Sequence, residues 1–120
     1  MTGKRKVYAW TDLPRETVRP GVSRAGFRGD NALLVMNWLE PGMEPRPHSH
    51  PFDQVAYIIS GRVRFTVGDD VVEVGPGELL HIPADIVHFG EVVGDEPAVN
   101  LDMFSPVRAD YEHLTKYQQD

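Results

Sequence analysis

The sequence has 120 residues, enough for one domain with an apolar core but too few for two ordinary domains. It has no cysteine, which excludes a disulfide scaffold, a thiolate metal site and a cysteine nucleophile. A net charge of −6 argues against sequence-independent binding of nucleic-acid phosphates. The apolar run at 32–36 is far shorter than the roughly 20 residues that span a membrane. No apolar segment follows Lys4-Arg5-Lys6, so we expect no signal peptide, no membrane partner and a cytoplasmic protein.

Short segments rich in β-branched and aromatic residues alternate with glycines and prolines along the chain, which is typical of a sandwich or barrel of short strands. Strict alternation at Arg62–Val67 predicts one buried and one solvated face, and Gly68-Asp69-Asp70 predicts a hairpin turn. The end of the chain, Asp110–Tyr117, is expected to form a short helix or a loose tail, with Asp110 as the candidate N-cap. Strands are predicted at 31–40, 54–60, 62–67, 71–74, 78–82, 87–93 and 98–104.

The densest polar signal is the segment Pro47–Gln54. Residues two apart in an extended chain point to the same side, so His48 and His50 face together and Gln54 has the same parity. His88 lies beyond a second turn-rich segment. Imidazoles and one amide oxygen suit a borderline divalent metal such as Zn, Ni, Fe, Mn or Cu. Taken alone, two neighbouring histidines are weak evidence for a metal and are more often plain surface residues.

The spacing of these residues resembles the two sequence motifs of the cupin family. Gly42-(five)-His48-x-His50-(three)-Gln54-(six)-Gly61 resembles the first motif, with glutamine where glutamate is usual. Gly77-(five)-Pro83-x-Asp85-xx-His88 resembles the second, with Asp85 where glycine is usual and Val92 where asparagine is usual.

The resemblance implies an all-β fold, the cupin double-stranded β-helix or jelly-roll barrel, as a single domain over 1–120 with a core barrel at about 30–104. It also implies one divalent metal held by His48, His50, Gln54 and His88. The alternative is a cupin that has lost its metal. Four uncharged ligands leave the full positive charge on the ion, which favours a Lewis acid that attracts an anionic substrate.

The segment 102–111, together with 48–57, resembles the KdgF family of small cupins, which act in pectin and alginate breakdown. That family opens 4,5-unsaturated monouronates to the linear 5-keto-4-deoxyuronate. The resemblance implies an acid/base role for Asp102, a substrate-contacting cation in Arg108 and a pocket wall in Phe104. From the residues alone, Asp102 is equally a solvated strand residue, Arg108 a partner of Asp110 or Glu112, and Phe104 plain core.

Several further residues have two readings. Tyr57 lines the substrate pocket or packs in the core, and Arg46 lies on the surface or approaches the site. His81 is structural or lies at the pocket mouth. Residues 1–30 contribute at most edge strands.

Two other functions stay open. One is a metal-dependent dioxygenase or a cyclase/isomerase of secondary metabolism, and the other is a non-catalytic cupin that binds a small ligand. In each case the expected partner is a small molecule, here an anionic one such as an unsaturated uronate, and not a nucleic acid. By analogy with small cupins that pair through their early strands, we also expect a homodimer.

Overall fold

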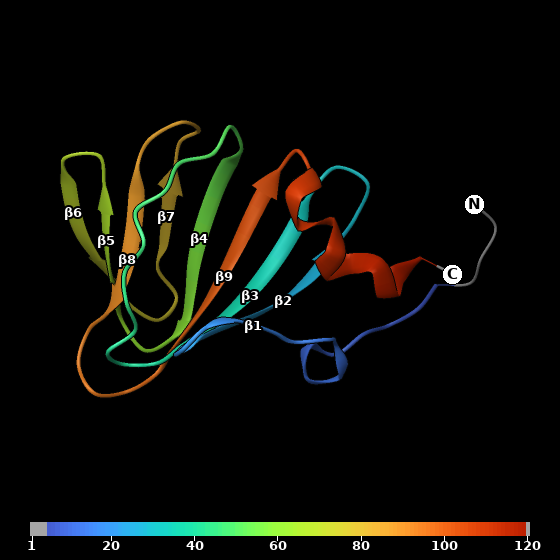
Figure 1. Cartoon of the computed structure of the whole chain (residues 1–120), viewed down its shortest axis with the longest axis horizontal. Coiled ribbons are helices and arrows are strands. Elements are labelled where there is room, and N and C mark those ends of the chain that lie inside the picture. Colours follow the sequence, from blue (N-terminus) through green and yellow to red (C-terminus); the bar gives the residue numbers. More distant parts are fainter. Residues whose placement is uncertain (1–4, 120) are drawn as a thin grey trace.

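Within residues 5–119, which the structure describes, the computed structural model has nine strands in two antiparallel sheets that face each other (Figure 1). The larger sheet has the strand order β1-β2-β3-β9-β4-β7 and the smaller has the order β6-β5-β8. This jelly roll confirms the predicted fold class. The strands are β1 (Glu16–Arg19), β2 (Val22–Arg28), β3 (Leu33–Leu39), β4 (Asp53–Ser60), β5 (Val63–Val67), β6 (Asp70–Val74), β7 (Leu79–Ile82), β8 (His88–Val92) and β9 (Ala98–Ser105).

The core between the sheets follows from alternation along the strands. In β5, Val63 and Phe65 are buried while Arg64 is exposed, as the sequence predicts. Their side chains meet those of the inner face of the larger sheet, including Ala56 and Ile58. Apolar burial of this kind is the main favourable term in folding, at about 25 cal/mol per Å² of area removed from water.

Strand β9 lies inside the larger sheet and brings distant segments together. It pairs with β3 on one side and with β4 on the other, so that Asp102 lies between these two strands and Gln54 lies opposite Phe104. A separate bridge joins His48 to His88 through two backbone hydrogen bonds of 3.1 and 2.9 Å. The topology therefore gathers three segments that are far apart in the sequence.

The start of the chain contributes more than edge strands. A 3-10 helix, η1 (Trp10–Asp12), precedes β1, and β2 pairs with β1 on one side and with β3 on the other. The larger sheet therefore begins at Glu16, which corrects the expected barrel start near residue 30.

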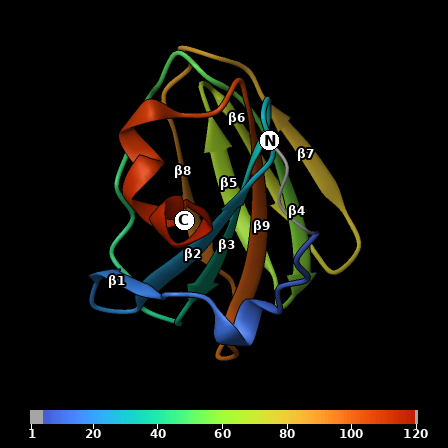
Figure 2. The same cartoon turned by 90° about the vertical axis from the view of Figure 1, so that its right-hand side faces the viewer.

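The C-terminal helix, η2 (Ala109–Gln118), is a 3-10 helix that lies against β2 (Figure 2). Gly26 of β2 makes this contact possible, because a Cβ there would lie 2.9 Å from the Cβ of Leu114. The prediction that Asp110 is the N-cap of this helix is wrong. The capping position is Arg108, and Asp110 lies in the first turn. None of the helices in the described residues is both long enough and apolar enough to span a membrane.

Several turn positions adopt the left-handed backbone region that favours glycine, and two of them, Asp85 and Gly61, also make close contacts. Asp85 has a φ of 67°, as expected for a residue that replaces a turn glycine. Its amide donates to the His50 carbonyl oxygen at 2.8 Å, which fixes the loop before β8 against the histidine segment. Gly61 has a φ of +76°, and a Cβ there would lie 2.5 Å from the carbonyl oxygen of Pro97.

Replacing Gly61 with alanine should lower the free energy of unfolding by roughly 2–4 kcal/mol, because backbone strain and a backbone clash act together. Gly94→Ala is the matched control, since Gly94 has a φ of +84° but open space around it. In the control the free energy of unfolding should fall only by the cost of the backbone strain, roughly 1–2 kcal/mol. Urea unfolding of the two variants measures both, and equal losses would contradict the clash.

Candidate functional site

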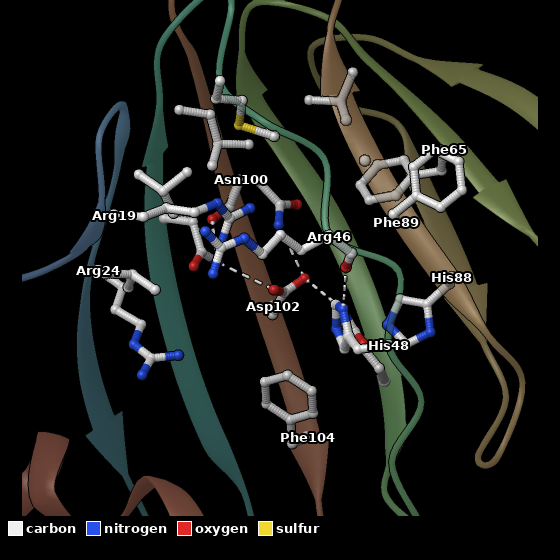
Figure 3. Close-up of a pocket in the computed structure, with 18 of the residues that line it drawn as sticks. Arg19, Arg24, Arg46, His48, Phe65, His88, Phe89, Asn100, Asp102 and Phe104 are labelled. Carbon is white, nitrogen blue, oxygen red and sulfur yellow. Dashed lines mark hydrogen bonds between the residues drawn. The ribbon is translucent and has the colours of Figure 1, made fainter.

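Three histidines come together in the described chain, and Figure 3 shows two of them, His48 and His88, side by side. His48 and His50 precede β4, and His88 begins β8. One ring nitrogen from each histidine lies within 4.8 Å of the others. His50 and His88 are buried, at 6% and 3% exposure, while His48 is exposed. The structure thus brings together the three histidines that the sequence singled out.

The backbone orients each of these rings. The Nδ1 atoms of His48, His50 and His88 bond to the carbonyl oxygens of Arg46, Phe52 and Ile86, at 2.8, 3.0 and 2.9 Å. A carbonyl oxygen only accepts, so each Nδ1 carries the proton and donates it. In a neutral imidazole the lone pair then sits on Nε2, the arrangement found in histidines that bind a metal.

Gln54 completes the set of donor atoms. Its Nε2 donates to Asp102 Oδ1 at 2.9 Å, which leaves its Oε1 turned toward His50 Nε2 at 3.0 Å. When His50 is neutral, the lone pair of its Nε2 therefore faces a lone pair of Gln54 Oε1. The buried His88 Nε2 has no hydrogen-bond partner among the described residues. A cation bound between these atoms would accept the two facing lone pairs and would give His88 Nε2 a partner. The residues present therefore fit a divalent metal.

Burial lowers the pKa of both His50 and His88, and the charge of Arg108 acts in the same direction. Burial is the larger cause for each ring. Both histidines are therefore held in the neutral form that a metal requires.

Asp102 is the only carboxylate among the described residues that line the cavity around these groups. Its Oδ1 accepts from Gln54 and Asn100, each at 2.9 Å, and its Oδ2 accepts from Asn37 at 3.0 Å. Burial raises the pKa of Asp102, while the three amide donors lower it. Asn100 Oδ1, beside it, is buried without a partner.

A cavity of about 150 Å³ opens over these groups. This is smaller than the roughly 300–1,000 Å³ of sites for drug-sized ligands, so it fits one small molecule. The predicted residues His48, Gln54, His88, Asp102, Phe104 and Arg108 all line it, and His50 lies behind them. The other lining residues are Val18, Arg19, Val22, Arg24, Asn37, Leu39, Met43, Arg46, Val63, Phe65, Phe89, Gly90, Asn100 and Tyr111.

Arg108 is a buried residue in the wall of this cavity. It is 6% exposed, and its Nε and Nη2 donate to the two carboxylate oxygens of Asp110 at 3.1 and 2.6 Å. Its guanidinium carbon lies 3.8 Å from the ring centre of Tyr111 and 4.7 Å from that of Phe104. The hydrogen bonds from Arg108 lower the pKa of Asp110. Arg108 therefore pairs with Asp110, one of the partners expected from the sequence, and also lines the cavity, while its contact with a substrate stays a prediction.

Two residues that the sequence connected with the pocket lie elsewhere. Tyr57 is three positions from Gln54 in β4, so its side chain points to the outer face of the larger sheet, and it does not line the cavity. This corrects its assignment as a substrate-binding residue. His81 lies on the same outer face, where its Nε2 contacts Asp53 Oδ1 at 2.6 Å.

Sequence reasoning missed four polar lining residues: Asn37 and Asn100, and Arg19 and Arg24 of the first two strands. The sequence does indicate that Asn100 and Asp102, two positions apart in the strand predicted at 98–104, lie on the same face. No pattern in the sequence pointed to Asn37, Arg19 or Arg24.

Comparison with known proteins agrees with this description. The pectin degradation protein KdgF of Dickeya dadantii is 27% identical over 109 residues, which cover 89% of this chain and 98% of that protein. The structure of KdgF from Halomonas sp. shares the fold, with a TM-score of 0.80 at 22% identity, over 89% of this chain and 98% of that one. An acireductone dioxygenase of Exiguobacterium sibiricum is 31% identical over 64 residues, which are 49% of this chain and 36% of the dioxygenase. The family model for the cupin domain matches residues 38–104, more than half of the sequence, so the chain belongs to the cupin family.

Proposed function

We propose that this cupin is a metal-dependent enzyme that converts 4,5-unsaturated monouronates to the linear 5-keto-4-deoxyuronate. The observation that carries the proposal is the hydrogen bond from Gln54 to Asp102, which holds a carboxylate directly beside the metal-binding donor atoms. The likeness to KdgF over nearly the whole chain supports the same reaction.

In this proposal His48, His50, His88 and Gln54 hold one divalent metal. When bound, the ion supplies a Lewis acid that polarises an oxygen of the substrate. Its identity is open among Zn, Ni, Fe, Mn and Cu, since histidine and amide ligands accept all of them. The four ligands are uncharged, so the ion keeps its full charge and favours an anion such as a uronate.

Asp102 moves the proton. Ring opening takes a proton from the anomeric hydroxyl, and ketonisation of the enol returns one to carbon, so the reaction is an isomerisation that needs no other reactant. Asp102 Oδ1 already accepts two amide hydrogens, whereas Oδ2 accepts only that of Asn37. Oδ2 is therefore the oxygen available to the substrate. Acid–base help of this kind is worth about 10²–10⁴ in rate.

Phe104 forms a buried wall of the cavity, and its ring lies 5.5 Å from that of His50, edge to face. This contact and the stacked Arg108 hold the wall rigid beside the metal ligands. Arg108 therefore acts as a positioning residue in this proposal.

The metal-loaded protein should speed the loss of the conjugated double bond of 4,5-unsaturated galacturonate, followed by ultraviolet absorbance. Treatment with a chelator should return the rate to that of spontaneous ring opening, and restoring the metal should recover it. A rate equal to the spontaneous one with metal bound would contradict the proposed reaction.

The likeness to an acireductone dioxygenase over half of the chain supports a second candidate, an oxygen-using enzyme with the same three histidines. Oxygen uptake by the iron-loaded protein separates the two, because the uronate reaction consumes none. Binding of a uronate without turnover would instead assign the chain to the non-catalytic cupins.

We also propose a homodimer. The outer face of the larger sheet leaves several apolar side chains exposed, a feature that supports association of two copies. These are Tyr57, Ile59, Leu79 and Met103. The cytoplasmic location expected from the sequence stays a prediction.

A further inference from the structure

Four arginines line the cavity within the described residues, and three of them form an ion pair, of which those of Arg108 and Arg24 are the shortest. Arg108 makes two hydrogen bonds to Asp110. Arg24 pairs with Glu16 at 2.7 Å, and its guanidinium lies over the ring of Tyr111. Both guanidinium groups are therefore engaged by a carboxylate of this chain, and each keeps further N–H donors.

The other two arginines are differently placed. Arg19 is half-buried and forms no ion pair with any of residues 5–119; its Nε donates to the backbone oxygen of Glu44 at 3.2 Å. Arg46 lies 3.6 Å from the Glu44 carboxylate, and both side chains are largely exposed, at 60% and 74%. Arg46 thus has only a long, exposed ion pair, and a pair of this kind contributes little.

Arg19 and Arg46 meet at the mouth of the cavity. In Figure 3 Arg19 extends from β1 and Arg46 from the segment that leads to His48, on opposite sides of the view, and both line the cavity. Burial lowers the pKa of Arg19, and the nearby charge of Arg46 lowers it further. The Arg46 carbonyl oxygen also accepts from His48 Nδ1, which ties this arginine to the metal ligands.

We propose that Arg19 and Arg46 together form the subsite that binds the carboxylate of the substrate. The inference rests on the proposed function for the identity of the substrate, a monosaccharide acid. Guanidinium groups form short, charge-assisted hydrogen bonds with carboxylates, and two of them on opposite sides fix the orientation of the anion. The subsite places the acid group at the mouth and the ring over Asp102.

The test uses Arg19→Gln, Arg46→Gln and the double variant, with Arg64→Gln as the matched control. Arg64 is exposed on β5, so its replacement removes the same charge away from the cavity. Calorimetry measures the binding of galacturonate, a non-reacting acid, and of neutral galactose to the metal-loaded proteins. Each single variant should weaken galacturonate binding about tenfold, as for one lost charge-assisted hydrogen bond. Galactose binding and metal content should stay unchanged, and Arg64→Gln should match the wild type.

With unsaturated galacturonate as the substrate, KM should rise about tenfold in each variant while kcat changes less than threefold, since the interaction is made in the ground state as well. Equal galacturonate affinity in the wild type and the double variant would overturn the subsite, as would no measurable galacturonate binding by the wild type. An equal loss in Arg64→Gln would also overturn it by assigning the effect to overall charge. If galacturonate binding depends on both arginines but the wild type shows no turnover, the subsite stands and the proposed reaction fails.

Discussion

Replacing His50 with alanine should reduce the bound metal from about one ion per chain to less than about 0.1. The ring is buried, its Nε2 faces the oxygen of Gln54, and its Nδ1 is held by the Phe52 carbonyl oxygen. Alanine removes one donor atom and leaves the Gln54 oxygen without its neighbour. Loss of an outer partner of a metal ligand typically costs 10–100-fold in affinity, and loss of the ligand itself should cost more.

Elemental analysis of the purified protein measures this directly. His81→Ala is the matched control, because His81 is an exposed histidine on the outer face of the larger sheet, away from the cavity. The control should keep its metal. Since the His50 ring also packs against Phe104, far-ultraviolet circular dichroism should first establish that the variant is folded. Full metal content in a folded His50→Ala protein would rule out the proposed ligand set.

The fold and the clustering of the histidines proposed as metal ligands were predictable because both follow from local patterns. Alternation in β5 and the turn residues around it fix which face is buried, and the two-residue spacing of His48 and His50 fixes their common side. The same parity rule excludes Tyr57 from the face that carries Gln54, so the signal against its assignment was present in the sequence.

The surroundings of Asp102 were not predictable, because they depend on strand register. Asn37 reaches the Asp102 carboxylate only because β3 pairs with β9 in a register that sets Asn37 opposite Asn100. Likewise, Arg24 faces the cavity only because β2 pairs with β3. A single sequence indicates which face of a strand each residue occupies. It does not fix which strands pair, or in which register, when they are more than 60 residues apart.

Replacing Asp102 with asparagine should lower kcat for unsaturated galacturonate by about 10²–10⁴-fold while the metal content stays near that of the wild type. The asparagine oxygen can still accept the hydrogen bonds of Gln54 and Asn100 that Oδ1 accepts, so Gln54 keeps its own oxygen turned toward the metal ligands. The amide nitrogen then occupies the place of Oδ2. It cannot take a proton, and it faces the donating nitrogen of Asn37.

Asp102→Ala separates the two roles assigned to this carboxylate. It removes the acceptor for Gln54 as well, so it should lose metal affinity in addition to turnover, whereas Asp102→Asn should lose turnover alone. Asp53→Asn is the control, because Asp53 is an exposed carboxylate that pairs with His81 on the outer face. Steady-state kinetics at saturating metal, with metal content measured on the same samples, distinguish the variants. If Asp102→Asn keeps more than about a tenth of the wild-type kcat, Asp102 orients Gln54 but is not the group that moves the proton.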